Sequence, residues 1–343
     1  MRLSDLDFHL PEELIAQQPL ADRSASRLLV VDRSTGTFRD SVFSEFPSLL
    51  KRDDLLVVNN SRVFPARLIG RSETGAAVEI FLVRELGGAR WEALARPAKR
   101  LQPGKRVLFG DELSAVVVER TDEGGVIVDL ECSGDVFEAI ESVGRTPLPP
   151  YIKRERDSDD TDRERYQTVY AKDRGSIAAP TAGLHFTPEI LAQIEQGGIK
   201  RIEVTLHVGY GTFQPIRSGD LTDHRVAPET YEISEAAARE LNTALDFGRR
   251  IVAVGTTTTR TLEDCYSRFG RFEPGRREAE LTITPGFQFT AVKALVTNFH
   301  LPQSSLLLLT STFGGRELIM TAYEHAVAEG YRFYSYGDCM FIF

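Results

Sequence analysis

Short runs of alternating hydrophobic and polar residues fill the chain between about residues 66 and 149. The runs include KRVLFG, LSAVVVERT and GGVIVDLEC, and glycine, proline and charged residues separate them. Alternation with a period of two places the apolar side chains on one face of a strand. Short strands at this spacing are typical of a β-barrel or sandwich. We therefore expect a small β-barrel over residues 66–149, with a boundary at the prolines at 147, 149 and 150.

The remaining segments, 1–65 and 150–343, predict a mixed α/β structure. Apolar strand-like runs such as RIVAVG and AVKALVTNFH alternate with amphipathic helix patterns such as SEAAARELNTALDFG and LIMTAYEHAVAEG. The pattern also predicts a surface loop over 153–174 and a final strand pair over 331–343. The expected fold class is α/β, and the alternation argues for an α/β sheet or a barrel-like layer.

Composition and charge narrow the function classes. The chain has 343 residues, 42% hydrophobic and 27% charged, which is typical of a globular protein. Its formal net charge of -9 argues against a protein that binds nucleic acid through bulk charge, so any such contact must use a local basic patch. RPAKRLQPGKR in the barrel segment supplies one, with Arg96, Lys99 and Arg100 as candidate phosphate contacts. A solvated charged face is the alternative.

Several classes of site and location are disfavoured. Cys132, Cys265 and Cys339 are odd in number and far apart, so they indicate neither a disulfide framework nor a CxxC metal site. No secretory signal and no apolar run of about 20 residues is present, so we expect a cytoplasmic protein without a membrane segment. HExxH, Walker A, GxGxxG and GxSxG motifs are all missing, and no metal is expected.

Five of the six histidines lie in the second α/β segment, which makes it the candidate site of chemistry. His185 lies in IAAPTAGLHFTPE, a stretch too polar for a core strand and too rich in proline and glycine for a helix interior. His207 ends the strand-like IEVTLHVG, where α/β folds place ligands, although a solvent-exposed face explains the spacing equally well. His300 follows AVKALVTNF, and its sequence context alone leaves its role open.

RIVAVGTTTTRTLED predicts a buried strand that ends at Gly255 and a helix that begins in a run of threonines. Free N–H groups at a helix N-terminus favour an anion. Thr256, Thr257, Thr258 and Thr259 are therefore candidate ligand-binding residues, with Arg260 as a possible charged partner. Plain N-capping by one threonine is the alternative.

Taken in order, the segments resemble one family, the S-adenosylmethionine:tRNA ribosyltransferase-isomerases of queuosine biosynthesis. The resemblance covers essentially the whole chain and is carried by DDLLVVNNSRVFPARLIGR, RPAKRLQPGKRVLF, GRTPLPPYIKR, RERYQTVYAKDRGSIAAPTAGLHFT, VTLHVGYGTFQPI, VGTTTTRTLE, TNFHLPQSSLLLL and YRFYSYGDCMFI. It implies transfer and isomerisation of the ribosyl moiety of S-adenosylmethionine onto 7-aminomethyl-7-deazaguanine at the tRNA wobble position. Epoxyqueuosine-tRNA, adenine and methionine are the implied products. The implied fold is a large α/β barrel-like domain (1–65 and 150–343) with an inserted small β-barrel domain (66–149), which agrees with the change of pattern near residues 66 and 149. S-adenosylmethionine is then a consumed substrate, and no cofactor is expected.

The resemblance also suggests roles for individual residues. His185 and His207, then His300, are the expected acid–base residues. Glu229 and Asp338 are candidates beside the sulfonium, and Thr256 to Arg260 for a carboxylate or phosphate. Tyr166 and Gln167 are candidates for contact with the RNA base, and Arg96, Lys99 and Arg100 for the tRNA backbone. The chain is expected to act as a monomer.

The chain departs from the family pattern at three positions. Ala227 stands where a second histidine is usual, Lys293 where an acid is usual and Thr258 where serine is usual. A tRNA-binding module without turnover and a metal-dependent barrel hydrolase are therefore kept as alternatives.

Overall fold

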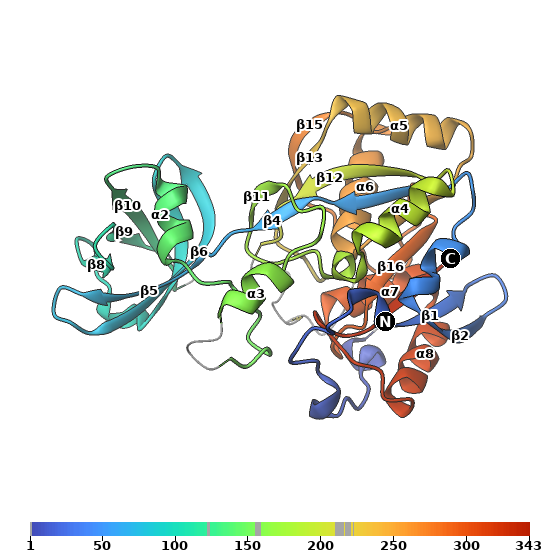
Figure 1. Ribbon diagram of the computed structural model, residues 1–343, viewed down its shortest axis with the longest axis horizontal. Coiled ribbons are helices and arrows are strands. Elements are labelled where there is room, and N and C mark those ends of the chain that lie inside the picture. Colours follow the sequence, from blue (N-terminus) through green and yellow to red (C-terminus); the bar gives the residue numbers. More distant parts are fainter. Residues whose placement is uncertain (1, 122–123, 155–158, 210–215, 217–220, 222) are drawn as a thin grey trace.

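The computed structural model of the chain describes residues 2–121, 124–154, 159–209, 216, 221 and 223–343. Figure 1 shows a small unit of strands beside a larger unit of strands and helices. The chain leaves the larger unit after β4 (Ser61–Val63), forms the small unit and returns to the larger one before α3 (Asp159–Arg165). The small unit is therefore an insertion in the larger one.

The larger unit is built on a nine-stranded mixed sheet. In spatial order its strands are β15 (Gly275–Ala279), β13 (Glu229–Ile233), β12 (Lys200–Leu206), β3 (Leu55–Asn59), β14 (Ile251–Val254), β16 (Ala294–Asn298), β17 (Cys339–Ile342), β1 (Arg27–Asp32) and β2 (Thr37–Val42). The four central strands β12, β3, β14 and β16 run parallel. Their carboxyl ends therefore meet at one edge of the sheet.

Both faces of this sheet are covered, which explains why its central strands are continuous apolar runs. Leu55 and Val57 of β3 pack in one core with the helices α5, α6, α7 and α8, whereas Leu56 and Val58 pack in a second core with α1 and α4. The helices of the larger unit are α1 (Phe46–Leu49), α3, α4 (Pro188–Gln196), α5 (Glu235–Asp246), α6 (Thr256–Phe269), α7 (Ser305–Gly314) and α8 (Arg316–Ala328).

The small unit is a closed antiparallel barrel. Its strands, in order around the barrel, are β10 (Val126–Cys132), β7 (Arg90–Arg96), β6 (Ala77–Gly87), β5 (Arg67–Ser72), β8 (Arg106–Phe109) and β9 (Leu113–Arg120). Trp91 lies in its core, and Ile140 of α2 (Val136–Val143) packs against the same core. The predicted α/β class with a small β-barrel is thereby confirmed.

Two local expectations are corrected. Only β17 forms a strand in the segment 331–343, because residues 331–338 make a turn in which Tyr334 has a φ of 75°. The expected loop over 153–174 contains α3 and the first residues of β11 (Asp173–Ser176), which pairs in parallel with β4. Both corrections concern segments that lie beside the candidate site.

Candidate active site

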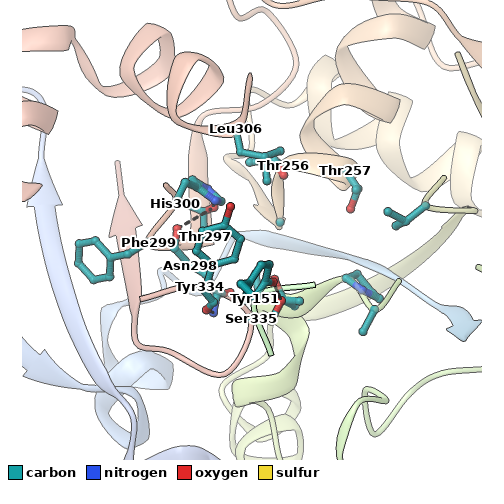
Figure 2. A pocket seen from close by; sticks show the side chains of 16 residues that line it. Tyr151, Thr256, Thr257, Thr297, Asn298, Phe299, His300, Leu306, Tyr334 and Ser335 are labelled. Carbon is teal, nitrogen blue, oxygen red and sulfur yellow. Dashed lines mark hydrogen bonds between the residues drawn. The ribbon is translucent and has the colours of Figure 1, made fainter. Parts of the chain in front are cut away.

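A cleft of about 550 Å³, here called the main cleft, lies at the carboxyl ends of β14 and β16. Its lining includes residues that directly follow these strands, Gly255 to Thr257 and Asn298 to His300. The opposite part of the lining comes from Tyr151 and from the turn that holds Tyr334 and Ser335 (Figure 2). Ligands of α/β sheets bind at this edge, because the strand ends and the helix N-termini converge there.

The predicted helix after Gly255 is confirmed as α6, and two of its four threonines line the main cleft. Thr258 and Thr259 are fully buried, and their hydroxyls donate to the carbonyls of Val254 (2.7 Å) and Gly255 (3.1 Å). Thr256 and Thr257 face the cleft, and the buried Thr257 Oγ1 has no hydrogen-bond partner among the described residues. A buried hydroxyl without a partner is costly, so it marks a place for a ligand atom.

Arg260 and Glu229 form an ion pair with each other. Arg260 Nη1 lies 2.7 Å from Glu229 Oε2, and both side chains are buried. Arg260 also donates to the carbonyls of Ala227, Ala279 and Leu281. These bonds fix the ends of β13 and β15, so the geometry argues against the predicted roles of Arg260 as an anion ligand and of Glu229 as the partner of a sulfonium.

A second chamber of about 450 Å³ adjoins the main cleft and shares Thr256, Thr257 and Leu306 with it. Its lining includes Glu229 and His224, whose Nε2 lies 2.7 Å from Ser305 Oγ. Burial lowers the pKa of His224, with a smaller contribution from Arg225. The N-terminus of α6 therefore lies between two connected spaces.

His300 is the imidazole that lines the main cleft among the residues that the structure describes. Its Nε2 lies 2.8 Å from Thr297 Oγ1, as Figure 2 shows, and its backbone N–H donates to the hydroxyl of Tyr323. Burial lowers the pKa of His300 to about 3. The ring is therefore neutral at pH 7 and can accept a proton.

His185 does not share that cleft. It lies at the end of the 3-10 helix Thr181–His185, and it lines a separate cavity of about 310 Å³. Its Nδ1 lies 2.8 Å from Ser26 Oγ. Its Nε2 is buried without a hydrogen-bond partner among the described residues, and so is the Oδ1 of Asn298.

Burial lowers the pKa of His185 to about 4, the nearby cations Arg23 and Arg332 lower it further, and Asn298 opposes the change. Asn298 Nδ2 donates to the carbonyl of Tyr334, so its Oδ1 must act as an acceptor. His185 Nδ1 is hydrogen-bonded to Ser26, and the ring lines a cavity other than the main cleft, so the predicted catalytic role of His185 stays a prediction.

His207 follows β12, and its ring lies against Gly175 of β11. Burial lowers the pKa of His207; Arg276 adds to that effect and Asp173 opposes it. Its Nδ1 is buried without a partner among the described residues. Part of the adjoining GYGTFQPI motif, residues 210–215, lies outside the described residues. The structure therefore brings His300 into the main cleft and leaves His185 and His207 elsewhere.

The remaining predicted substrate contacts have structural partners. Asp338 accepts the backbone N–H groups of Arg27 (2.9 Å) and Arg332 (2.8 Å), and burial raises its pKa. Gln167 closes a pair of bonds with the backbone of Val63. The Tyr166 ring is fully buried, which argues against the predicted stacking on an RNA base.

The aromatic wall of the main cleft was missed by the sequence reasoning. Tyr151 and Tyr334 lie with ring centroids 3.9 Å apart, and the Tyr151 hydroxyl is hydrogen-bonded to Ser335. Tyr334 adopts a left-handed backbone conformation, with φ 75°. Non-glycine residues in this region cluster at functional sites. The FYSYGD sequence was a usable signal, since a serine and a glycine among the residues that follow an aromatic pair indicate a turn.

The basic strip lies on the barrel. Arg96 ends β7 and is exposed, Lys99 in the 3-10 helix Ala98–Arg100 is exposed, and the Arg100 side chain lies outside the described part of the structure. Exposure is compatible with phosphate contact, and the role of these residues stays a prediction.

The described residues hold no group of three or more His, Cys, Asp or Glu side chains suited to a metal ion. Within the same residues, no helix combines the length and the apolar character that crossing a membrane requires.

A ligand cleft at the carboxyl edge of parallel strands, beside a helix N-terminus and a neutral buried imidazole, is typical of an α/β enzyme. Residues 3–342 match the family described as queuosine biosynthesis protein. The S-adenosylmethionine:tRNA ribosyltransferase-isomerase of Syntrophotalea carbinolica is 51% identical over 344 residues, which cover 100% of each chain. The crystal structure of S-adenosylmethionine tRNA ribosyltransferase from Thermotoga maritima is 36% identical, with a TM-score of 0.56 over 99% of this chain and 100% of that one.

The chain therefore belongs to the queuosine biosynthesis protein family. The family resemblance and the transferase-isomerase class predicted from the sequence are confirmed.

Proposed function

We propose that the protein transfers and isomerises the ribosyl moiety of S-adenosylmethionine onto 7-aminomethyl-7-deazaguanine at the wobble position of tRNA. The products are epoxyqueuosine-tRNA, adenine and methionine. The observation that carries the proposal is the pair of adjoining spaces around the start of α6, with His300 in one of them and an unpartnered Thr257 hydroxyl in the lining of both. S-adenosylmethionine is consumed as the ribosyl donor, and no cofactor takes part.

The two spaces suit a ligand with two halves. They adjoin at Thr256, Thr257 and Leu306, which line both of them. We place the methionine carboxylate at the N-terminus of α6, where the free backbone N–H groups and the Thr257 hydroxyl can donate to it. The adenosyl half then lies in the main cleft.

The sulfonium of this ligand meets aromatic rings and not a carboxylate. None of the described residues that line the main cleft is acidic, and Glu229 in the second chamber is neutralised by Arg260. Tyr151 and Tyr334 line the cleft, and a cation over an aromatic ring gains about 0.5–2 kcal/mol. Their rings replace Glu229 and Asp338 as the partners of the cation in this proposal.

His300 takes the proton that must leave the sugar carbon next to the sulfonium or the substrate amine. Thr297 Oγ1 lies 3.4 Å from the carbonyl of Asn298, to which it can donate. It then accepts the N–H of His300 Nε2, and Nδ1 keeps its lone pair for the substrate proton. The low pKa of His300 keeps this lone pair available throughout the neutral range.

The test is release of adenine from S-adenosylmethionine, measured by chromatography with tRNA that carries 7-aminomethyl-7-deazaguanine. Adenine should appear in proportion to modified tRNA, and neither unmodified tRNA nor S-adenosylmethionine alone should support it. His300→Gln should abolish most turnover, whereas the matched control His325→Gln, on the outer face of α8, should retain it. Binding of the modified tRNA without adenine release would overturn the proposal in favour of an RNA-binding module.

A further inference from the structure

The separate cavity beside His185, here called the arginine cavity, contains two guanidinium groups that the mechanism above does not use. Arg23 and Arg165 line this space of about 310 Å³ together with His185, Ser335 and Tyr336. Ser335 also lines the main cleft. A group bound in the arginine cavity would therefore be separated from a ligand in the main cleft by Ser335, which lines both spaces.

The guanidinium groups of this cavity are bonded to neutral acceptors. Arg23 donates to the carbonyls of Gln167 (2.7 Å) and Leu184 (3.3 Å) and to two carbonyls of α3. Arg165 donates to the carbonyls of Leu20 and Ala21, and its Nε is buried without a partner. Among the described residues, neither arginine has a carboxylate within 4.0 Å.

Three other half-buried or buried arginines are neutralised by a carboxylate, whereas Arg33 donates to the carbonyls of Phe313 and Lys293 and has no carboxylate partner among the described residues. Arg154 lies 2.5 Å from Asp162, Arg250 lies 2.6 Å from Asp54, and Arg260 pairs with Glu229. Arg332 adds a third cation near the arginine cavity, and its Nη1 is buried without a partner among the described residues. Acidic residues lie near these cations, Glu164 near Arg23, Asp22 near Arg165 and Asp338 near Arg332, but none forms a direct ion pair with them among the described residues. Positive charge that is partly removed from water and has no directly paired carboxylate favours an anion.

We propose that the arginine cavity binds a phosphate group of the RNA strand next to the nucleotide that is modified. This inference rests on the proposed function. An arginine fork matches the geometry of phosphate oxygens, and phosphate contacts fix the position of a bound nucleic acid. The shared residue Ser335 places such a phosphate beside the main cleft while the modified base occupies the cleft itself. Arg23 and Arg165 then orient the nucleotide, and the barrel strip contacts more distant phosphates.

The experiment compares Arg165→Gln with Arg163→Gln, which makes the same charge change on the same helix but removes an exposed residue paired with Glu141. The probe is an anticodon stem–loop RNA that contains 7-aminomethyl-7-deazaguanine, and its Kd is measured over a range of salt concentrations. Arg165→Gln should raise the Kd about tenfold and lower the salt slope by about one, because one phosphate contact is lost. Arg163→Gln should change the Kd less than about threefold, as expected for a distant charge.

A second measurement needs no variant of the protein and so does not depend on the folding of Arg165→Gln. Neutral methylphosphonate linkages are placed one at a time around the modified nucleotide. One linkage next to that nucleotide should weaken binding to the unaltered protein about tenfold, and the same linkage should have little further effect on Arg165→Gln.

Two results would overturn the inference. One is an unchanged RNA affinity for Arg165→Gln with no sensitive linkage beside the modified nucleotide. The other is a loss of affinity for S-adenosylmethionine alone, which would assign the cavity to its carboxylate. Either result with normal adenine release by the unaltered protein leaves the proposed function intact, whereas absence of adenine release rejects the proposed function itself.

Discussion

Replacement of His300 by glutamine tests the assignment of the base most directly. Glutamine can keep a hydrogen bond to Thr297 Oγ1, but it cannot take a proton near neutral pH. A positioned base contributes about 10²–10⁴-fold to the rate, so kcat for adenine release should fall by that factor. Binding of S-adenosylmethionine should change little, because His300 contacts the ligand only in the proton transfer.

The burial of His300 gives this prediction a pH signature. A histidine with the ordinary pKa of about 6.5 is about three-quarters neutral at pH 7 and about 3% neutral at pH 5, so a base of that kind loses about 25-fold of its activity. Burial lowers the pKa of His300 to about 3, and such a ring is still about 99% neutral at pH 5. The contribution of His300 should therefore be nearly constant between pH 5 and pH 7.

The assay is the rate of adenine release by the unaltered protein and by His300→Gln across that pH range. In the ratio of the two rates, the effect of the ionisation of the substrate amine cancels, because both proteins receive the same substrate. A constant ratio of at least about 10² is expected. A ratio that falls tenfold or more toward pH 5 would show an ordinary imidazole pKa, and a ratio near one at every pH would remove His300 from the reaction.

Three further predictions follow from the site. Thr257→Val should raise the KM for S-adenosylmethionine about tenfold, the value of one lost hydrogen bond, whereas Thr258→Val, whose hydroxyl donates to the carbonyl of Val254 at the end of β14, should leave KM unchanged; equal effects on KM would contradict this. The free energy of unfolding should fall as pH falls from about 6.5 to about 4, because the unfolded chain binds a proton at His185 and the folded chain does not; His185 contributes up to about 1.4 kcal/mol per pH unit to this fall. Denaturant titrations of His185→Asn should show a shallower fall, and a slope identical to that of the unaltered protein would contradict the buried neutral ring. Glu229→Gln should cost about 3–5 kcal/mol of unfolding free energy by leaving the buried Arg260 unpaired, and a loss below about 1 kcal/mol in the same titrations would show that Arg260 finds another partner.

The sequence predicted the elements of the site better than their grouping. Alternation over 66–149 and the RIVAVGTTTTR pattern correctly indicated the barrel and the start of α6, because both depend on local periodicity and on the conformation of Gly255. Which threonines face a ligand depends on the rotation of α6. That rotation is set by packing of Leu262 and Cys265 against the sheet, which the sequence does not reveal.

The sequence could not predict which histidine lines which cavity, for a different reason. His185 and His300 both follow apolar segments. However, the 3-10 helix that carries His185 lines one cavity with Ser26 and with the turn at Ser335, and these three segments are far apart in the sequence. Only the order of strands in the sheet decides that His300 opens into the main cleft. The arginine cavity is likewise assembled from three distant segments, so no local pattern marks it.

The left-handed backbone of Tyr334 sets stability against activity at this position. A left-handed conformation at a tyrosine costs about 1–3 kcal/mol that a glycine would not, so Tyr334→Gly would relieve strain while removing an aromatic wall of the cleft. Selection for thermal stability and selection for turnover therefore act in opposite directions at this one position. A library screened only for heat resistance should accumulate glycine or asparagine at 334, and each such clone should be a stable protein with an impaired cleft.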